Sequence, residues 1–374
     1  MNRLISILFF LFLFTGSIQA FSQEQTAIPK ADSLTGNAVG TKSEGGKKFN
    51  AGDLIFEHVV DNHEWHIVEI GNVEITIPLP VILLYKGDIF CFSSHRFHNE
   101  THSYEGFRLE QAGANKGKII ALEASGNPVQ GSKVYDFSIT KTVLAIFISA
   151  ALLIWIFVSV ANRYKSNRNK APKGLQSLLE PLIIFVRDDI AKSSIGEKKY
   201  EKFMPFLLTI FFFIFFNNLF GLIPFFPGGA NVTGNIAVTL VLAVFTFLIT
   251  TISGNKHYWI DVINTPGVPW WLKFPIPLMP IVEIIGLITK PFVLMVRLFA
   301  NITAGHIIAL GFVSLIFIFG AISAALGLGV SVVSVIFMVF MDLLELLVGF
   351  IQAYVFTLLS ALYFGLATVE PEHH

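Results

Sequence analysis

The sequence predicts an all-α polytopic membrane protein with a small extramembrane β-rich domain near its N-terminus. Three observations indicate this fold class. Apolar residues make up 53% of the 374 residues and charged residues only 14%. This composition is more apolar and less charged than that of a typical soluble protein, which favours a membrane protein. Five long apolar segments occupy the C-terminal part of the chain, and short alternating runs precede them. The apolar content indicates that the lipid bilayer surrounds much of the chain. Basic and acidic residues are equal in number, so we expect no nucleic-acid partner.

Residues 1–20, MNRLISILFFLFLFTGSIQA, have the pattern of a secretory signal peptide. Arg3 precedes an apolar run, and small residues lead to a cleavage site after Ala20. An uncleaved anchor helix is the alternative, but the polar residues from Thr15 to Gln19 shorten the run below the ~17 residues that a span needs. The mature N-terminus is therefore expected outside the cytoplasm.

Residues 21–48 are polar and rich in Gly, Ser, Lys and Thr, which predicts a disordered tether. Residues 49–137 contain alternating runs such as HIVEIGNVEITI, broken by Gly and Pro, and they predict a small β-rich domain on the periplasmic side. The remaining residues, 138–374, form the predicted membrane domain.

Two histidine-rich patches lie in the extramembrane domain. Imidazole is a common metal ligand, yet the motifs HEWH and HRFH lack a recognised ligand pattern, so we expect no metal and no cofactor. The patches consist of His58, His63 and His66, and of His95, His98 and His102. The single cysteine, Cys91, excludes an intramolecular disulfide and any multi-cysteine metal site.

The first predicted span is residues 142–161, which are uncharged and long enough to cross the ~30 Å hydrocarbon layer. A cluster of basic residues from Arg163 to Lys173 follows at once and marks the cytoplasmic side. Residues 174–192 mix an apolar face with charges, which is typical of an amphipathic helix in the cytoplasmic interface. Residues 203–226 and 236–253 then cross outward and back.

The last two apolar segments, residues 280–318 and 328–368, are each near forty residues long. As helices each would be ~60 Å long, about twice the hydrocarbon thickness. Ordinary tilt does not absorb that excess. We therefore expect a long, steeply tilted C-terminal hairpin that turns within GAISAALGLG and kinks near Pro291.

The hairpin contains an unusual number of polar and ionisable residues. Such groups at membrane depth cost about 2.5–3.5 kcal/mol each on insertion scales, so they usually line a water path or meet a partner charge. The first arm carries Glu283, Lys290, Arg297, Asn301 and His306, and the second carries Asp342, Glu345 and Gln352. The spacing of the first four predicts that they share one helical face.

Two polar pairs indicate the same register for the antiparallel arms. The midpoint of Arg297 and Gln352 falls between Ala324 and Ala325. The midpoint of His306 and Glu345 falls one residue later, so both lie inside the expected turn. We therefore predict that each pair lies close together. Nine residues turn a helix by about half a revolution, so His306 should face away from Arg297 and serve a different water path.

These residue types suit the movement of protons through lipid. Because a guanidinium keeps its proton, Arg297 attracts a passing carboxylate but does not relay protons, which is the behaviour of a gate. His306 and Glu345 exchange protons with water and suit an access channel. Glu283 and Lys290 either join this path or mark the cytoplasmic interface, and Asp342 either tunes Glu345 or is a solvated neighbour.

From about residue 49 to the C-terminus the chain resembles subunit a of F-type ATP synthases. The resemblance rests on KPFVLMVRLFANITAGH, FVRDDIAK, FMPFLLTIFFFIFFNNLFGLIP, TGNIAVTLVLA and IQAYVFTLLSALYFGLA. It implies that Arg297 faces a rotor ring of c subunits and separates two offset half-channels. It also implies roles for Asn301 and Gln352 as the family's asparagine and late glutamine. His306 and Glu345 stand where the family often has an acid and a histidine, so the two types are exchanged.

The resemblance implies further partners and a location. It implies a peripheral stalk of b subunits, the remaining ATP synthase subunits, and a bacterial inner membrane with the C-terminus in the cytoplasm. The uncharged NNLFGLIP stretch, where some relatives place an acid, makes Asn217 and Asn218 weaker candidates for the outer path.

The chain has no phosphate-cradling Gly-Lys loop, so no catalytic site is expected on it. A self-contained ion-coupled transporter is the alternative function. Transporters of the inverted-repeat kind have two halves with matching broken helices, and no such repeat appears in the sequence.

Overall fold

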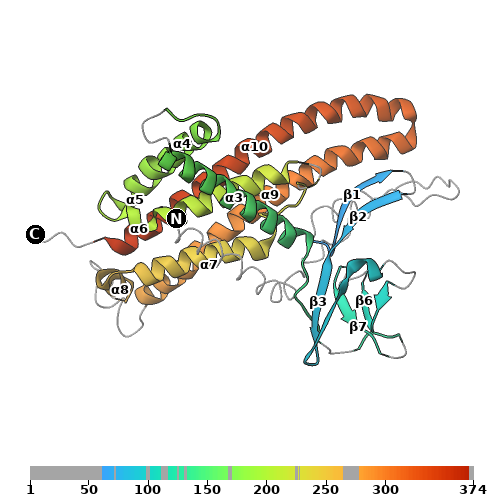
Figure 1. The fold of residues 1–374 in the computed structure, drawn as a ribbon, viewed down its shortest axis with the longest axis horizontal. Coiled ribbons are helices and arrows are strands. Elements are labelled where there is room, and N and C mark those ends of the chain that lie inside the picture. Colours follow the sequence, from blue (N-terminus) through green and yellow to red (C-terminus); the bar gives the residue numbers. More distant parts are fainter. Residues whose placement is uncertain are drawn as a thin grey trace, which may run out of the picture. The chain divides into compact units, whose positions relative to one another are not determined.

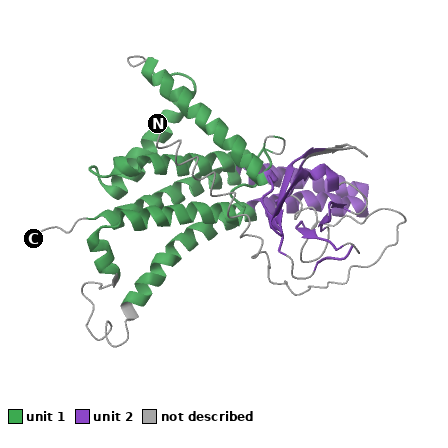
Figure 2. Ribbon diagram, turned by 60° about the horizontal axis from the view of Figure 1, so that its bottom comes forward, with its two compact units in different colours: residues 1–16, 142–304, 344–374 green, residues 17–141, 305–343 purple. Residues whose placement is uncertain are grey.

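The computed structural model describes residues 61–369 except 71–72, 98–101, 111–116, 124–125, 130–132, 167–170, 224–225, 227 and 264–277. The predicted signal peptide and tether, together with His58 and His98, lie outside the described residues. The described chain forms two compact units (Figure 2). Unit 1 contains residues 142–304 and 344–369, and unit 2 contains residues 61–141 and 305–343.

The N-terminal part of unit 2 is built from short antiparallel strands (Figure 1). They are β1 (Glu64–Ile70), β2 (Val73–Pro78), β3 (Pro80–Tyr85), β4 (Asp88–Ser93), β5 (Ser103–Tyr104), β6 (Phe107–Leu109), β7 (Ile119–Ala121) and β8 (Tyr135–Asp136). The sheets have the strand orders β1-β2, β4-β3-β8 and β5-β6-β7. The alternating pattern of β3 places Val81 and Leu83 on one face, where both are fully buried. Phe107 packs edge-on against Phe90 in the same core.

Helices make up the rest of the chain. They are α3 (Lys141–Ser166), α4 (Leu175–Phe185), α5 (Ser193–Ile195), α6 (Tyr200–Gly221), α7 (Ile236–Ser253), α8 (Lys256–Ile263), α9 (Leu278–Ile322) and α10 (Ala324–Thr368). A π-helical segment, Val186–Lys192, connects α4 to α5. The expected interfacial helix over residues 174–192 is thus an α-helix continued by a π-helix, and α8 was not predicted.

Five of these helices are long and apolar enough to cross a membrane. They are Lys141–Ser166, Tyr200–Gly221, Ile236–Ser253, Pro280–Ile322 and Ala324–Thr368. This finding confirms the predicted class, a helical membrane protein with an N-terminal β-containing region. The steep tilt of the last two helices stays a prediction.

Helix α6 is the most buried of the five apolar helices. Most of its apolar residues are buried, as expected for a helix that packs against several others. Phe212 contacts Phe157 of α3 with ring centroids 4.9 Å apart. Phe203 stacks on Phe364 of α10, also at 4.9 Å. These aromatic contacts hold α3 and the C-terminal half of α10 against α6.

The hairpin turn is tighter than the sequence predicts. Only Ser323 separates α9 from α10, whereas the ten residues of GAISAALGLG were expected to form the turn. The glycines and alanines there continue the helices, which keeps nearly every backbone group hydrogen-bonded within apolar surroundings. Glycine is required at Gly327, because a Cβ there would lie 2.7 Å from the Cα of Gly320. Pro291, where a kink was expected, lies inside the single helix α9.

Candidate functional site

Arg297 lies on an exposed face of α9 within unit 1. Asn301, one turn later, is exposed on the same face. Apolar neighbours on this face are also exposed, with Val293 42% and Val296 37% exposed. A charge set in an apolar stripe is costly in lipid unless a partner covers it. The face therefore has the character of an interface that carries one fixed positive charge.

A polar cluster lies where α6 ends and α7 begins. Asn218, in the last turn of α6, donates a hydrogen bond to the carbonyl of Gly349 on α10 at 3.0 Å. The hydroxyl of Thr233, in the loop before α7, donates to the side-chain carbonyl of Asn218. Asn218 and Thr233 are both buried. The amide of Asn218 is thus satisfied by groups from two other segments of unit 1.

This cluster lies beside two of the predicted site residues. Glu345 and Gln352 flank Gly349 by about one helical turn on either side, and both are buried. A Cβ at Gly349 would approach the Cβ of Asn218 to 3.1 Å, so the glycine permits the close approach of α6. We call Asn218, Thr233, Glu345, Gly349 and Gln352 the outer cluster.

Helix α9 reaches the same loop through Thr303. Its hydroxyl donates to the carbonyl of Gly234 at 3.4 Å. The side-chain amide nitrogen of Asn231, in the same loop, is buried and has no hydrogen-bond partner in the described part of the chain. A buried donor without a partner costs about 1–3 kcal/mol, so water is its natural partner here.

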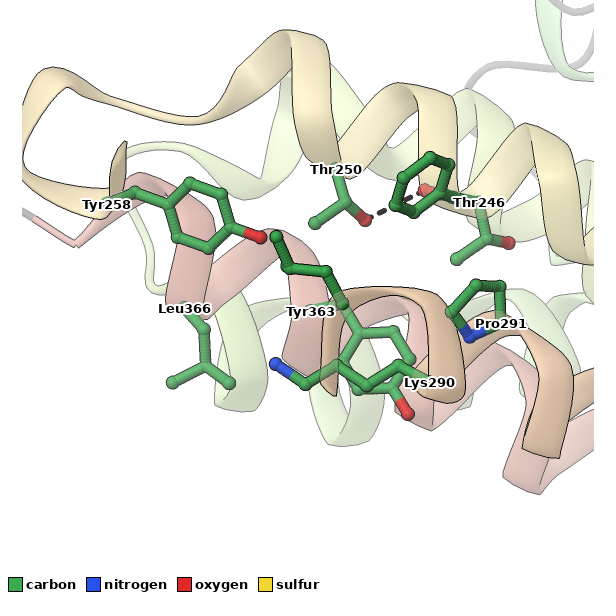
Figure 3. Close-up of a pocket in the computed structure, with 9 residues that line it drawn as sticks. Thr246, Thr250, Tyr258, Lys290, Pro291, Tyr363 and Leu366 are labelled. Carbon is green, nitrogen blue, oxygen red and sulfur yellow. Dashed lines mark hydrogen bonds between the residues drawn. The ribbon is translucent and has the colours of Figure 1, made fainter. Parts of the chain in front are cut away.

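A pocket at the other end of unit 1 is lined by polar groups from four helices (Figure 3). Its lining residues are Thr246, Phe247, Thr250, Tyr258, Leu287, Lys290, Pro291, Tyr363 and Leu366. The ammonium of Lys290 lies over the ring of Tyr363, 5.8 Å from its centroid. Burial, reinforced by the negative charge of Glu283, raises the pKa of Tyr258 above its usual value. We call this feature the inner pocket.

Helix α7 separates the outer cluster from the inner pocket. Thr233 and the N-cap residue Asn235 precede its first turn, whereas Thr250 lies in its last turn. An 18-residue helix is about 27 Å long, close to the thickness of a hydrocarbon layer. The two polar features therefore lie at opposite ends of a membrane-length helix.

Arg297 lies midway between these features along α9. Lys290, in the inner pocket, precedes it by two helical turns, or about 10 Å. Thr303, which binds the loop beside the outer cluster, follows it by six residues, or about 9 Å. Two polar regions thus approach one fixed positive charge from opposite sides.

The sequence-predicted residues are only partly brought together. No hydrogen bond joins Arg297 to Gln352 within the residues that the structure describes. Arg297 is exposed, whereas Gln352 is buried. His306 belongs to unit 2 and Glu345 to unit 1, so their proximity stays a prediction. Asp342 is exposed on α10.

Contacts within each unit give the local register of the hairpin. In unit 2, Phe312 stacks on Phe337 with centroids 5.3 Å apart, and their midpoint falls between Ala324 and Ala325. In unit 1, the midpoint of the Lys290–Tyr363 contact falls two residues later. Each contact is close to the register that the polar pairs predict, although the polar pairs themselves are not tested.

Several polar residues of the site were missed by the sequence reasoning. Thr233, Thr303, Tyr258, Tyr363 and Asn231 each contribute a group to the outer cluster, its loop or the inner pocket. Most side-chain hydroxyls in these helices instead bond back to their own helix, as Thr357 does to Ala353 at 2.7 Å. The sequence alone does not distinguish the two behaviours. Among the described residues, no group of three or more His, Cys, Asp or Glu side chains is placed to hold a metal ion.

Comparison with known proteins gives two family matches. Residues 143–365 match the family described as ATP synthase A chain. Residues 54–137 match a domain of unknown function, DUF8433. Among similar proteins, one named ATP synthase subunit a from Chloroherpeton thalassium is 47% identical over 246 residues, which cover 64% of this chain and 69% of the relative. One named ATP synthase subunit a 2 from Chlorobaculum tepidum is 44% identical over 286 residues, covering 75% and 73%. One named ATP synthase subunit a from Myxococcus xanthus is 42% identical over 243 residues, covering 64% and 76%.

Proposed function

This chain belongs to the ATP synthase A chain family and is a membrane subunit of the proton-translocating Fo sector, and we propose that Arg297 separates two half-paths for protons within it. It works with the other ATP synthase subunits, and the self-contained transporter is not favoured. The family assignment is consistent with the expectation that this chain has no catalytic site.

The observation that carries the proposal is the position of Arg297 between the inner pocket and the outer cluster. In the proposal, protons enter from one aqueous side through Asn218, Glu345 and the polar groups near Gln352. They leave on the other side through the pocket that contains Lys290. A fixed guanidinium between the two blocks a direct proton leak, because it repels a proton and does not release its own.

The proposed partner at the exposed face is the rotor ring of c subunits. A carboxylate carried past Arg297 would be held in its ionised form, because a nearby positive charge lowers the pKa of an acid. The exposed apolar side chains around Arg297, such as Val293 and Val296, would pack against the c subunits. Asn301 is proposed to orient the passing group, and Gln352 to orient Arg297.

We assign the other predicted residues to the approaches. His306 and Glu345 are proposed to exchange protons with water along the outer path. Asp342 is proposed as a neighbour that tunes the proton affinity of Glu345. Glu283 and Lys290 are proposed to attract and release protons at the inner pocket. The b-subunit peripheral stalk is proposed as a second partner, from the family relation rather than from a particular contact.

We further propose a location and an orientation. The charge cluster after α3 and the N-terminal signal pattern both favour a bacterial inner membrane with the β-rich domain in the periplasm and the C-terminus in the cytoplasm. The outer cluster then lies on the periplasmic side and the inner pocket on the cytoplasmic side.

The proposal is tested with Arg297→Ala and Arg297→Lys in inverted membrane vesicles. ATP-driven proton pumping should fall to background in the alanine variant, while native gels show an assembled complex. Lysine should substitute poorly, because a desolvated ammonium releases its proton more readily and lacks the planar fork of arginine.

Arg163→Ala is the matched control, since Arg163 is an exposed arginine in the last turn of α3. It should pump at the wild-type rate. Near-normal pumping by Arg297→Ala would show that Arg297 is structural and that the proposed separation of the half-paths is wrong.

A further inference from the structure

A buried ion pair joins the beginning of β1 to the segment that leads into α3. Nε2 of His63 lies 2.7 Å from a carboxylate oxygen of Asp136, and each side chain is only 7% exposed. His95 and His102, the other histidines of this domain whose side chains are described, are exposed or hydrogen-bonded to backbone. Burial against a carboxylate therefore distinguishes His63.

The pair is part of a hydrogen-bonded layer that includes the whole connection from β8 to α3. The second carboxylate oxygen of Asp136 accepts the backbone N–H of Ser138 at 2.9 Å. The hydroxyl of Ser138 accepts the backbone N–H of Ile82 on β3 at 3.1 Å. Asp136 thus fixes the backbone of Ser138, whose hydroxyl bonds to the sheet.

Two further bonds fasten the same two segments to one another. The hydroxyl of Thr140 donates to Asp61 at 2.8 Å. The backbone N–H of Lys141 donates to the carbonyl of Asn62 at 2.9 Å. The two residues that precede His63 are therefore bonded to Thr140 and to Lys141, the first residue of α3, so a change at the ion pair acts on the segment that leads into this helix.

Stability alone does not account for a titratable pair in this position. Replacing a buried ion pair with apolar groups of similar volume is often neutral or stabilising, whereas removing the charge from one partner is costly. The domain has a separate apolar core around Leu83 and Phe107. A pair that adds little to stability but responds strongly to the loss of one charge has the properties of a switch.

We propose that His63 and Asp136 form a proton-dependent latch that holds residues 136–141 against the rest of the β-rich domain when His63 is protonated. When His63 loses its proton, the carboxylate of Asp136 keeps its charge in a buried site without a cation opposite it. The layer of hydrogen bonds around Ser138 and Lys141 then loosens. The latch is independent of the half-paths proposed above and would exist even if those were wrong.

The direction of the pH dependence follows from both partners. Burial alone would lower the pKa of His63, but the hydrogen bond and negative charge of Asp136 outweigh it and raise the pKa above its usual 6.5. Burial would raise the pKa of Asp136, but its bonds from His63 and Ser138 hold it below the usual 3.8. The stabilisation that protonated His63 contributes to the fold is fully present below pH 6.5 and is lost as pH rises through the raised pKa of His63. The stabilisation that ionised Asp136 contributes to the fold is present above pH 3.8 and is lost as pH falls through the lowered pKa of Asp136.

The other charges near the latch favour protonated His63. Asp61 and Glu64, which flank it in the sequence, both add negative charge and raise its pKa. Lys141 places a positive charge near Asp61 and partly balances it. The latch is therefore closed between the ordinary pKa values of the two partners and opens in alkaline solution.

Hydrogen–deuterium exchange of the full-length chain in its purified complex tests the latch. The reporters are the amides of Ser138 and Lys141, whose hydrogen bonds belong to the layer. After correction for intrinsic exchange, protection of the 136–141 segment should fall as pH rises above 6.5, up to tenfold for each unit by which the pKa of His63 is raised. Protection in the apolar core around Leu83 should stay nearly constant.

His63→Gln retains a hydrogen-bond donor but does not titrate, so its protection should be low and independent of pH. His95→Gln, which changes an exposed histidine of the same domain, should keep the wild-type profile. If His63→Gln fails to accumulate, the wild-type profile still decides the question. A flat wild-type profile, or the same pH dependence in His63→Gln, would overturn the proposal.

Discussion

The amide of Asn218 joins α6 to the carbonyl of Gly349 on α10, 3.0 Å away, between the buried residues Glu345 and Gln352. This contact links the most buried of the five apolar helices to the part of α10 that carries two predicted proton-path residues. The sequence makes Asn218 a weaker candidate for the outer path, because its stretch is uncharged where some relatives have an acid. In the structure a neutral amide is suitable there, since it donates to one helix and accepts from Thr233 at the same time.

Asn218→Leu should slow proton conduction without preventing assembly. The substitution removes the donor to Gly349 and the acceptor for Thr233, and two buried groups left without partners cost about 1–3 kcal/mol each. Passive proton uptake by vesicles depleted of the catalytic sector measures the effect. The matched control is Asn217→Leu, because Asn217 is equally buried but donates only to Phe213 of its own helix. Equal losses in the two variants would contradict a specific role for Asn218.

Gly365→Ala should disrupt packing more than any other glycine-to-alanine change in α10. A Cβ at Gly365 would collide with the backbone carbonyl of Ser194, which cannot rotate away as a side chain can. We expect reduced accumulation of the chain in membranes and a lower melting temperature of the complex. Gly329→Ala is the control, because a Cβ there meets nothing within 4 Å. It should leave both quantities unchanged or raise them, since alanine favours helix over glycine.

The five apolar helices could be predicted because length and hydropathy determine which segments cross a bilayer. The bounds of α7 agree with the predicted 236–253, since Asn235 is a strong N-cap and the side-chain carbonyl of Asn235 accepts from Ala237 at 2.9 Å. Phe312 and Phe337 stack about the hairpin midpoint that the sequence predicts, whereas the pairing of the polar residues from which it was predicted stays a prediction. The exact turn could not be predicted, since Gly and Ala permit either helix or loop and packing decides between them.

The parts of the site that could not be predicted are those that depend on a single interhelical bond. Thr246 bonds to its own helix at Leu242 and also reaches Ser360 of α10 at 3.3 Å. Thr250, one turn later, bonds only to Thr246 of its own helix. The two threonines are indistinguishable in sequence. They lie one turn apart on the same face of α7, so the sequence does not tell which of them bonds to α10.

Cys91 provides a direct test of the proposed orientation. It is the only cysteine in the chain and is exposed on β4. A membrane-impermeant maleimide should therefore label it in intact spheroplasts and should fail to label it in sealed inverted vesicles. Denatured samples give the total amount of thiol, and Cys91→Ser gives the background. The opposite pattern would place the β-rich domain in the cytoplasm.

Disulfide crosslinking tests the register of α9 against α10 and provides its own positive control. In a Cys91→Ser background, each engineered pair contains the only two thiols, so any bond is assigned without ambiguity. The pair Phe312→Cys and Phe337→Cys should form efficiently, because these rings stack with centroids 5.3 Å apart. A disulfide requires Cα atoms within about 7 Å, so crosslinking reports contact and not mere proximity.

The predicted pairs are Arg297 with Gln352 and His306 with Glu345, each replaced by cysteines. Since their midpoints agree with that of Phe312 and Phe337 to within one residue, both should crosslink if the register persists along the hairpin. Arg297 is exposed while Gln352 is buried, so its pair should form more slowly than the phenylalanine pair. A disulfide between Arg297→Cys and Phe356→Cys would instead mean that the arms are shifted by one helical turn, or about 6 Å along the axis. Efficient bonding of that shifted pair, with neither predicted pair formed, would show that the polar residues of the two arms do not face one another.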